Sequence, residues 1–194
     1  MAPTPGPSTP ATETDVRDRT GSRPGGRSDG CLVVDGDALT AVEWWVPTGR
    51  VVLAGAPGLA EAVEAQARLL GWSVSVLAPD AATEAARVAT PADAVVVLSH
   101  EPTIDEPVLV AALQGHAGYI GAIGSRGTVA ARPARLIAAG ADPATFHRIH
   151  SPVGLDLGGT NPAETALSIC AEILAGRAGR SAAPLASTTG AITG

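Results

Sequence analysis

The sequence contains no lysine, so its 13 basic residues are all arginines, and they are scattered singly rather than gathered into a stripe. With 19 acidic residues, the net charge is -6. The chain therefore lacks the basic surface that binds nucleic acid or an anionic membrane, and small molecules or proteins are the expected partners. The missing lysine also excludes the phosphate-binding loop GxxxxGK[ST].

Cysteines and long apolar runs are scarce as well. The only two cysteines, Cys31 and Cys170, lie far apart, and Cys170 falls in an apolar helical pattern. This favours a buried free thiol over a disulfide or a metal pair. No stretch reaches the ~18 apolar residues of a membrane span, and the N-terminus lacks a charged-then-apolar signal pattern. We therefore expect an unexported protein of the reducing cytoplasm, with no membrane segment.

Composition divides the chain into one domain and two tails. Residues 1–30 are dominated by Pro, Gly, Ser, Thr and charged residues, a composition that predicts a disordered tail. The composition of residues 179–194 predicts a flexible tail in the same way. Residues 49–178 have the length of one ordinary domain, and a hydrophobic content of 45% for the whole chain is enough to build its core.

A short segment, residues 31–48, precedes this domain. Two apolar runs flank Asp35-Gly36-Asp37, which is typical of a tight hairpin. We expect the hairpin, or remnant of an N-terminal domain, to pack Trp44 and Trp45 onto the main body.

The main domain alternates apolar strands with helical patterns. Its four predicted strands are too apolar for a sheet with a face in water, so they should be buried on both sides. They span residues 50–55, 73–79, 93–100 and 118–124. The alternation predicts an α/β fold with a doubly wound, mostly parallel sheet, whose ligands bind beyond the carboxyl ends of the strands.

Three helix signals follow the second strand. Asp105 can cap a helix that continues to about residue 115, and a further helical stretch to residue 140 should kink or break at Pro133. The clearest start is Asn161 as N-cap, Pro162 at the first helical position and Glu164 three residues after the cap.

The first candidate site is the turn GAPGLA, residues 55–60, which follows a strand and opens a helix. Gly55 and Gly58 could let backbone amides approach a phosphate. Pro57 removes one such amide, and the next strand is followed by Ala78 rather than by an acidic residue for a ribose. This turn therefore favours a structural role over binding of NAD(P).

Two further strands end in polar residues. His100 follows the third strand and could contact a ligand or shuttle a proton, or it could simply hydrogen-bond its loop. Gly124, Ser125 and Arg126 follow the fourth strand. They could form an anion site at a helix N-terminus, or a plain cap beside a solvated arginine.

The loop RIHSPVGLDLGGTNPAE, residues 148–164, is more polar and flexible than a connection requires. Its candidate ligand-binding residues are His150, Gly154, Asp156, Gly158 and Asn161. No Ser-His-Asp order is supported and no His/Cys cluster has metal spacing, so catalytic residues stay unassigned and no metal site is predicted.

In their order along the chain, SHEPTID, YIGAIGSRGT and RIHSPVGLDLGGTNPAETALSICAEILAGR resemble the C-terminal Rossmann-like domain of the XdhC family, the xanthine dehydrogenase accessory proteins. The resemblance covers about residues 50–177. The residues that fall on the family's pattern are Tyr119, Gly121, Gly124, Ser125, Arg126, Thr128, His150, Pro152, Gly154, Leu155, Asp156, Gly158, Pro162, Glu164, Ser168, Ala171 and Glu172.

The chain departs from that pattern in its first half. Pro57 and Gly58 stand where the family usually has a glycine and a histidine, Ala78 replaces an acidic residue, and Gly127 replaces an arginine. We expect the family's N-terminal domain to be absent or reduced to the segment around Cys31.

The resemblance implies a non-enzymatic carrier that binds molybdenum cofactor and delivers it to xanthine dehydrogenase or a related molybdenum hydroxylase. An anionic pterin or a nucleotide would lie against Ser125, Arg126, His100 and the loop of residues 150–161. Cofactor-synthesis or sulfuration proteins, and a second copy of the chain, remain open as further partners. The alternatives are a protein-binding remnant of the family and, with less support, an NAD(P)-dependent oxidoreductase.

Overall fold

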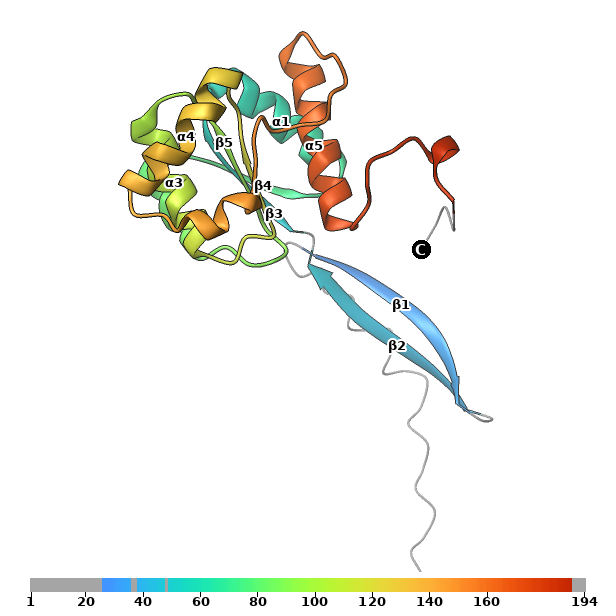
Figure 1. The fold of residues 1–194 in the computed structure, drawn as a ribbon. Helices are drawn as coiled ribbons and strands as arrows, with labels where there is room; N and C mark the ends of the chain where they lie inside the picture. The colour runs from blue at the N-terminus through green and yellow to red at the C-terminus, as the bar shows by residue number, and fades with distance from the viewer. Residues whose placement is uncertain (1–25, 36–37, 48, 190–194) are drawn as a thin grey trace, which may run out of the picture. The chain divides into compact units, whose positions relative to one another are not determined.

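The structure, a computed structural model, describes residues 26–35, 38–47 and 49–189 (Figure 1). The chain divides into two units, residues 1–46 and 47–194. Its helices and strands are β1 (Gly26–Asp35), β2 (Ala38–Pro47), β3 (Arg50–Gly55), α1 (Pro57–Leu69), β4 (Ser73–Leu77), α2 (Pro79–Arg87), β5 (Ala94–Leu98), α3 (Pro102–Gln114), β6 (Tyr119–Ala122), α4 (Arg126–Ala138), η1 (Pro143–Arg148), β7 (Ile149–His150), α5 (Pro162–Arg177) and η2 (Leu185–Ser187).

Strands β1 and β2 pair in a sheet of their own. Strand β1 begins at Gly26 and so takes in residues that the sequence places in the tail. The predictions for residues 1–25, for the Gly36-Asp37 turn and for the side chains of Cys31, Trp44 and Trp45 lie outside the described part of the chain.

The second unit contains a five-stranded sheet in the order β4-β3-β5-β6-β7. All of its neighbouring strands run parallel, which confirms the predicted doubly wound α/β fold. The order reverses after β4, because β5 returns to the other side of β3. The carboxyl ends of β3 and β5 therefore form the point at which such sheets bind ligands.

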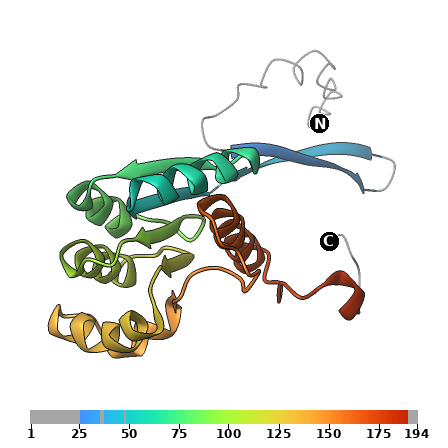
Figure 2. The same cartoon turned by 90° about the horizontal axis from the view of Figure 1, so that it is seen from above.

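Helices cover both faces of this sheet. Alternate residues of each strand point to opposite faces, so Val95 and Val97 pack with the residues of α2, α3 and α4, whereas Ala94, Val96 and Leu98 pack with those of α1 and α5. Figure 2 shows α3 and α4 on one side and α5 on the other. Strand β5 is buried at every position, as predicted.

The prediction that every strand is buried on both faces is wrong for β4. This strand lies at the edge of the sheet, and Val76 is 44% exposed. The periodicity of a short apolar run does not distinguish an edge strand from a central one.

Of the kink or break predicted at Pro133, the break does not occur, since α4 continues through this residue to Ala138. Proline removes the amide that would bond to the carbonyl of Val129. Arg132 and Leu136 are both buried on either side of Pro133, and this packing holds the helix together across the missing bond.

The start of α5 agrees with the prediction. The Asn161 side chain accepts a hydrogen bond from the Glu164 amide at 3.0 Å, and Pro162 is the first helical residue. The Glu164 carboxylate in turn accepts from the amide of Thr160 at 2.7 Å. Among the described residues, no helix combines the length and apolar character needed to cross a bilayer.

Candidate ligand site at the carboxyl edge of the sheet

The ends of β3 and β5 touch through their backbones at Gly55. The amide of Ala56 donates to the carbonyl of Leu98 at 2.8 Å. Gly55 has φ +108°, and a Cβ at this position would lie 2.5 Å from the Leu98 oxygen. Only glycine fits this close approach, so Gly55 is required for the contact between the ends of β3 and β5.

Helix α1 starts directly above this contact. Pro57 is its first residue, and the Ala56 N-cap makes no side-chain hydrogen bond. Gly58 is exposed, and a Cβ placed there would meet nothing within 4 Å. The turn therefore lacks one amide donor at Pro57 but leaves open space over Gly58.

His100 lies at the end of β5 and is exposed. Its neighbour Ser99 accepts a hydrogen bond from the Glu101 amide at 3.0 Å. Within the described residues His100 itself makes no hydrogen bond or ion pair. The loop is thus held without His100, whose imidazole remains available to a ligand.

Ser125 caps α4, which begins at Arg126. The Ser125 hydroxyl accepts a hydrogen bond from the Thr128 amide at 3.2 Å. Arg126 is exposed and pairs with no carboxylate of the described residues. The amides of Arg126 and Gly127 likewise find no backbone acceptor in this part of the chain. A guanidinium and two free amides at a helix N-terminus can bind an anion.

A buried ion pair, which the sequence reading did not identify, lies between α3 and α4 next to this edge. Arg132 is 3% exposed, and its guanidinium lies 3.1 Å from the carboxylate of fully buried Asp105. Arg132 also donates to the Ile123 carbonyl at 2.7 Å and to the Ser151 hydroxyl. The pair therefore ties the segments that follow β6 and β7 to α3.

Asp105 is consequently not the predicted helix cap. Helix α3 begins three residues earlier, at Pro102, and Asp105 faces the core. A signal was present in the sequence, because Val129, Arg132 and Leu136 share one helical face. A charged residue on an apolar face indicates a buried partner.

His150 belongs to a second cluster, with Tyr119 and Glu172. It lies on β7 opposite Gly121 of β6, and its ring stacks on Tyr119 with centroids 4.6 Å apart. Glu172 of α5 accepts hydrogen bonds from Nδ1 of His150 at 2.9 Å and from the hydroxyl of Tyr119 at 2.7 Å. Burial, followed by the bond to Glu172, raises the pKa of Tyr119, so the phenol stays protonated and donates.

The loop after β7 folds onto α5. The amide of Gly154 donates to Glu172 at 2.6 Å, and the amide of Leu155 donates to the carbonyl of Ser168 at 3.3 Å. Asp156 is exposed and bonds to no other described residue, while Gly158, with φ +70°, faces open space. Asn161 acts as the cap of α5.

The candidate residues thus fall into two groups. The ends of β3, β5 and β6 carry Gly55, Gly58, His100, Gly124, Ser125 and Arg126, whereas β7 and its loop carry His150, Gly154, Asp156, Gly158 and Asn161. The Arg132 contact with Ser151 links the two groups, but no hydrogen bond joins His150 to His100 or Arg126. Cys170 is a buried free thiol, as predicted, and burial raises its pKa to about 11.

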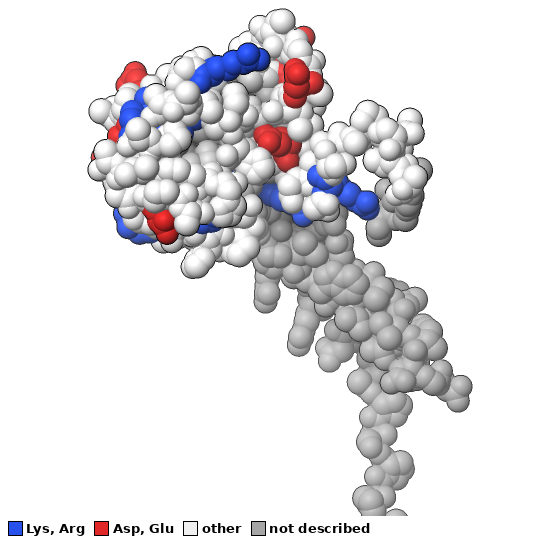
Figure 3. Space-filling model, viewed as in Figure 1, with Lys and Arg blue, Asp and Glu red and all other residues white. Residues whose placement is uncertain are grey.

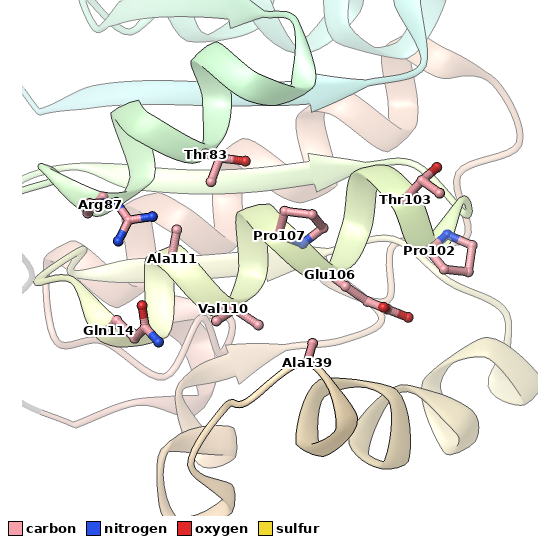
Figure 4. A pocket seen from close by; sticks show the side chains of 10 residues that line it. All are labelled: Thr83, Arg87, Pro102, Thr103, Glu106, Pro107, Val110, Ala111, Gln114 and Ala139. Carbon is pink, nitrogen blue, oxygen red and sulfur yellow. The ribbon is translucent and has the colours of Figure 1, made fainter.

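An open groove of about 430 Å³ lies elsewhere, along α3 (Figure 4). Its lining residues come from α2, from α3 and from the end of α4, and none is a predicted site residue. They are Thr83, Arg87, Pro102, Thr103, Glu106, Pro107, Val110, Ala111, Gln114 and Ala139. We place the candidate site at the strand ends, because a guanidinium and two amides without partners in the described segments are there. Charged side chains are spread singly over the face shown in Figure 3. In the described segments no three His, Cys, Asp or Glu residues gather as a metal site.

The strand order and the helix starts at its carboxyl edge define a Rossmann-like α/β domain. The chain belongs to the XdhC family, since the family model of the XdhC Rossmann domain matches residues 51–173. This confirms the family that the sequence motifs indicate.

A structural comparison gives the same fold. The chain is similar to a crystal structure from Bacillus halodurans described as a xanthine dehydrogenase, with a TM-score of 0.56 and 22% identity. The match covers 76% of this chain and 47% of the other, so the chain spans just under half of that protein. No curated protein matches the chain.

Proposed function

We propose that this chain is an accessory protein of a molybdenum hydroxylase such as xanthine dehydrogenase, and that it binds an anionic pterin or nucleotide at the carboxyl edge of its sheet. Membership of the XdhC family supports the accessory role. The observation that carries the ligand site is Arg126, an exposed guanidinium at a helix N-terminus with no carboxylate partner in the described residues.

The residues at this edge fit the phosphate group of such a ligand. Arg126 supplies a charged fork, the amides of Arg126 and Gly127 supply neutral donors, and the space over Gly58 is open. His100 could donate a further hydrogen bond. If the ligand is molybdenum cofactor, the metal and its dithiolene would supply redox chemistry to the client enzyme, while this chain would hold and orient the pterin phosphate.

The oxidoreductase alternative has less support. Pro57 removes an amide from the turn where a pyrophosphate would bind, and Ala78 offers no carboxylate to a ribose. Residues of the chain itself therefore favour a phosphate-holding role over dinucleotide binding.

Pterin content tests the proposal. The protein, co-expressed with molybdenum-cofactor synthesis, would be purified and oxidised, and the released fluorescent pterin measured in wild type, Arg126→Ala and Arg68→Ala. The control Arg68 is an exposed arginine on α1, and its one ion pair among the described residues is with Glu64 of the same helix. Loss of one charge-assisted contact should weaken binding about tenfold or more in Arg126→Ala alone.

Each other outcome has a definite meaning. Equal pterin in all three proteins would refute a site at Arg126. No pterin in any of them, together with retained binding to the client enzyme, would favour the protein-binding remnant instead.

A further inference from the structure

Glu172 connects three separate parts of the domain. Its carboxylate accepts hydrogen bonds from the Tyr119 hydroxyl of β6 at 2.7 Å, from the Gly154 amide of the loop at 2.6 Å and from His150 Nδ1 of β7 at 2.9 Å. The first two bonds go to Oε2 and the third to Oε1, so both oxygens are used.

These contacts determine which nitrogen of His150 carries the proton. An ionised carboxylate can only accept, so Nδ1 must donate and the neutral ring keeps its lone pair on Nε2. The stacked Tyr119 ring, inclined by 24°, holds the plane of the imidazole. The His150 side chain is 44% exposed, so the ring remains open to solvent.

Anchoring of the loop does not account for the bond to His150. The bonds to Gly154 and Tyr119 already tie the loop and β6 to α5. The bond between the solvent-exposed His150 and the partly buried Glu172 adds little stability of its own, because water competes for the imidazole. Its distinct effect is the orientation and tautomer of one histidine.

We propose that Glu172 is a positioning residue that presents Nε2 of His150 as a fixed acceptor for an N–H or O–H group of the bound ligand. Both a pterin and a nucleotide carry such donors. This inference rests on the proposed function for the ligand, whereas the effect of Glu172 on His150 stands independently of it. The titratable groups that contact His150 in the described residues are Glu172 of α5 and Tyr119 of β6.

The tautomer is measured by 15N NMR of the imidazole rings. The chain has four histidines, so a His150→Gln variant assigns the signal. Neutral His150 should carry its proton on Nδ1 in wild type. Glu172→Gln should mix the tautomers, because a neutral amide can donate to Nδ1 as well as accept from it. Tyr119→Phe, which keeps the stacked ring and removes one bond to Glu172, should leave the tautomer unchanged.

A wild-type His150 with its proton on Nε2 would overturn the positioning role, and this result needs no variant to fold. An unchanged tautomer in Glu172→Gln would overturn it as well.

The ligand part is tested by fluorescence titration with a pterin phosphate, with GMP in parallel, at neutral pH. His150→Gln should bind about fivefold more weakly than wild type, because the Nε2 acceptor is lost. Unchanged affinity in His150→Gln, with wild-type binding intact, would overturn the ligand contact and leave the proposed function standing. Failure of wild type to bind either probe would overturn both.

Discussion

Asp105 and Arg132 are the residues at which a single substitution should lower the stability of the domain most. Both are nearly inaccessible, and their charged groups lie 3.1 Å apart. Removing one partner leaves an uncompensated buried charge, so Asp105→Ala should lower the free energy of unfolding by about 3–5 kcal/mol. Urea denaturation followed by circular dichroism measures the loss.

Asp80→Ala is the matched control, because Asp80 is an exposed acidic residue in the first turn of α2. The double variant Asp105→Leu, Arg132→Met should recover part of the loss, since neither charge then stays unpaired. A change below about 1 kcal/mol in Asp105→Ala would show that Arg132 finds enough compensation in its bonds to Ile123 and Ser151.

The sequence predicts residue roles well where the partners are close along the chain. The caps Ser125 and Asn161 each bind an amide three residues ahead, so a local pattern suffices. The pattern wrongly predicts Asp105 as a third cap, because its true partner Arg132 lies 27 residues away. The Glu172 contacts span 18 to 53 residues, and only the packing of α5 on the sheet brings them together.

At the scale of elements, two glycines of one loop allow the cost of backbone strain to be measured apart from the cost of a steric clash. Gly154 and Gly158 have φ +106° and +70°, so alanine is strained at both. A Cβ at Gly154 would also lie 2.5 Å from the Ser168 hydroxyl, whereas nothing lies within 4 Å at Gly158. Gly154→Ala should therefore destabilise the domain by about 1–3 kcal/mol more than Gly158→Ala, as judged by urea midpoints. Equal losses of stability in the two variants would mean that α5 and the loop can move apart to accommodate the Cβ at position 154.

The stability that the N-terminus of α5 contributes should depend on pH through the carboxyl group of Glu164. Its pKa is lowered, chiefly by the hydrogen bond from the Thr160 amide. A carboxyl whose pKa is lower in the folded state stabilises the fold at pH values above its unfolded pKa, about 4.3. This stabilisation is lost as the pH falls through the folded pKa. Glu164→Gln should thus lower the urea midpoint at about pH 6 and converge with wild type at an acidic pH below the folded pKa.

Glu61→Gln is the control for this measurement, because Glu61 is an exposed glutamate of α1 without a described hydrogen bond. A constant gap between Glu164→Gln and wild type at both pH values would contradict an ionic contribution and leave only the neutral hydrogen bond.

Elements with an unbroken apolar run or a capped start could be predicted, and elements without one could not. The strands of residues 50–55 and 118–124 and the helix after Asn161 are where the pattern indicates them. Strand β7 has two residues, too few for an alternation to emerge, and η1 has no apolar run, because Thr145, His147 and Arg148 are among its six residues. Missing β7 hid the position of His150, which lies within the sheet rather than in a free loop.

At the scale of the whole molecule, the topology follows from the alternation of strands and helices, and the strand ends named as candidates do lie on one edge. The division of the candidate residues into two groups could not be foreseen, because it depends on the side of the sheet that each side chain faces. His150 is directed toward α5 by its position on β7, one residue after Ile149, which packs with the opposite core.

The second unit should fold without residues 1–46. Among the residues whose side chains the structure describes, both hydrophobic cores lie between positions 51 and 173, which coincides with the span of the family match. A fragment of residues 47–194 should therefore unfold in one cooperative transition, with a Tm within about 4 °C of the full chain. Calorimetry of the two proteins at equal concentration makes the comparison. A Tm lower by more than about 10 °C would mean that residues 1–46 contribute several kcal/mol to the stability of this unit, and any ligand measurement would then require the full chain.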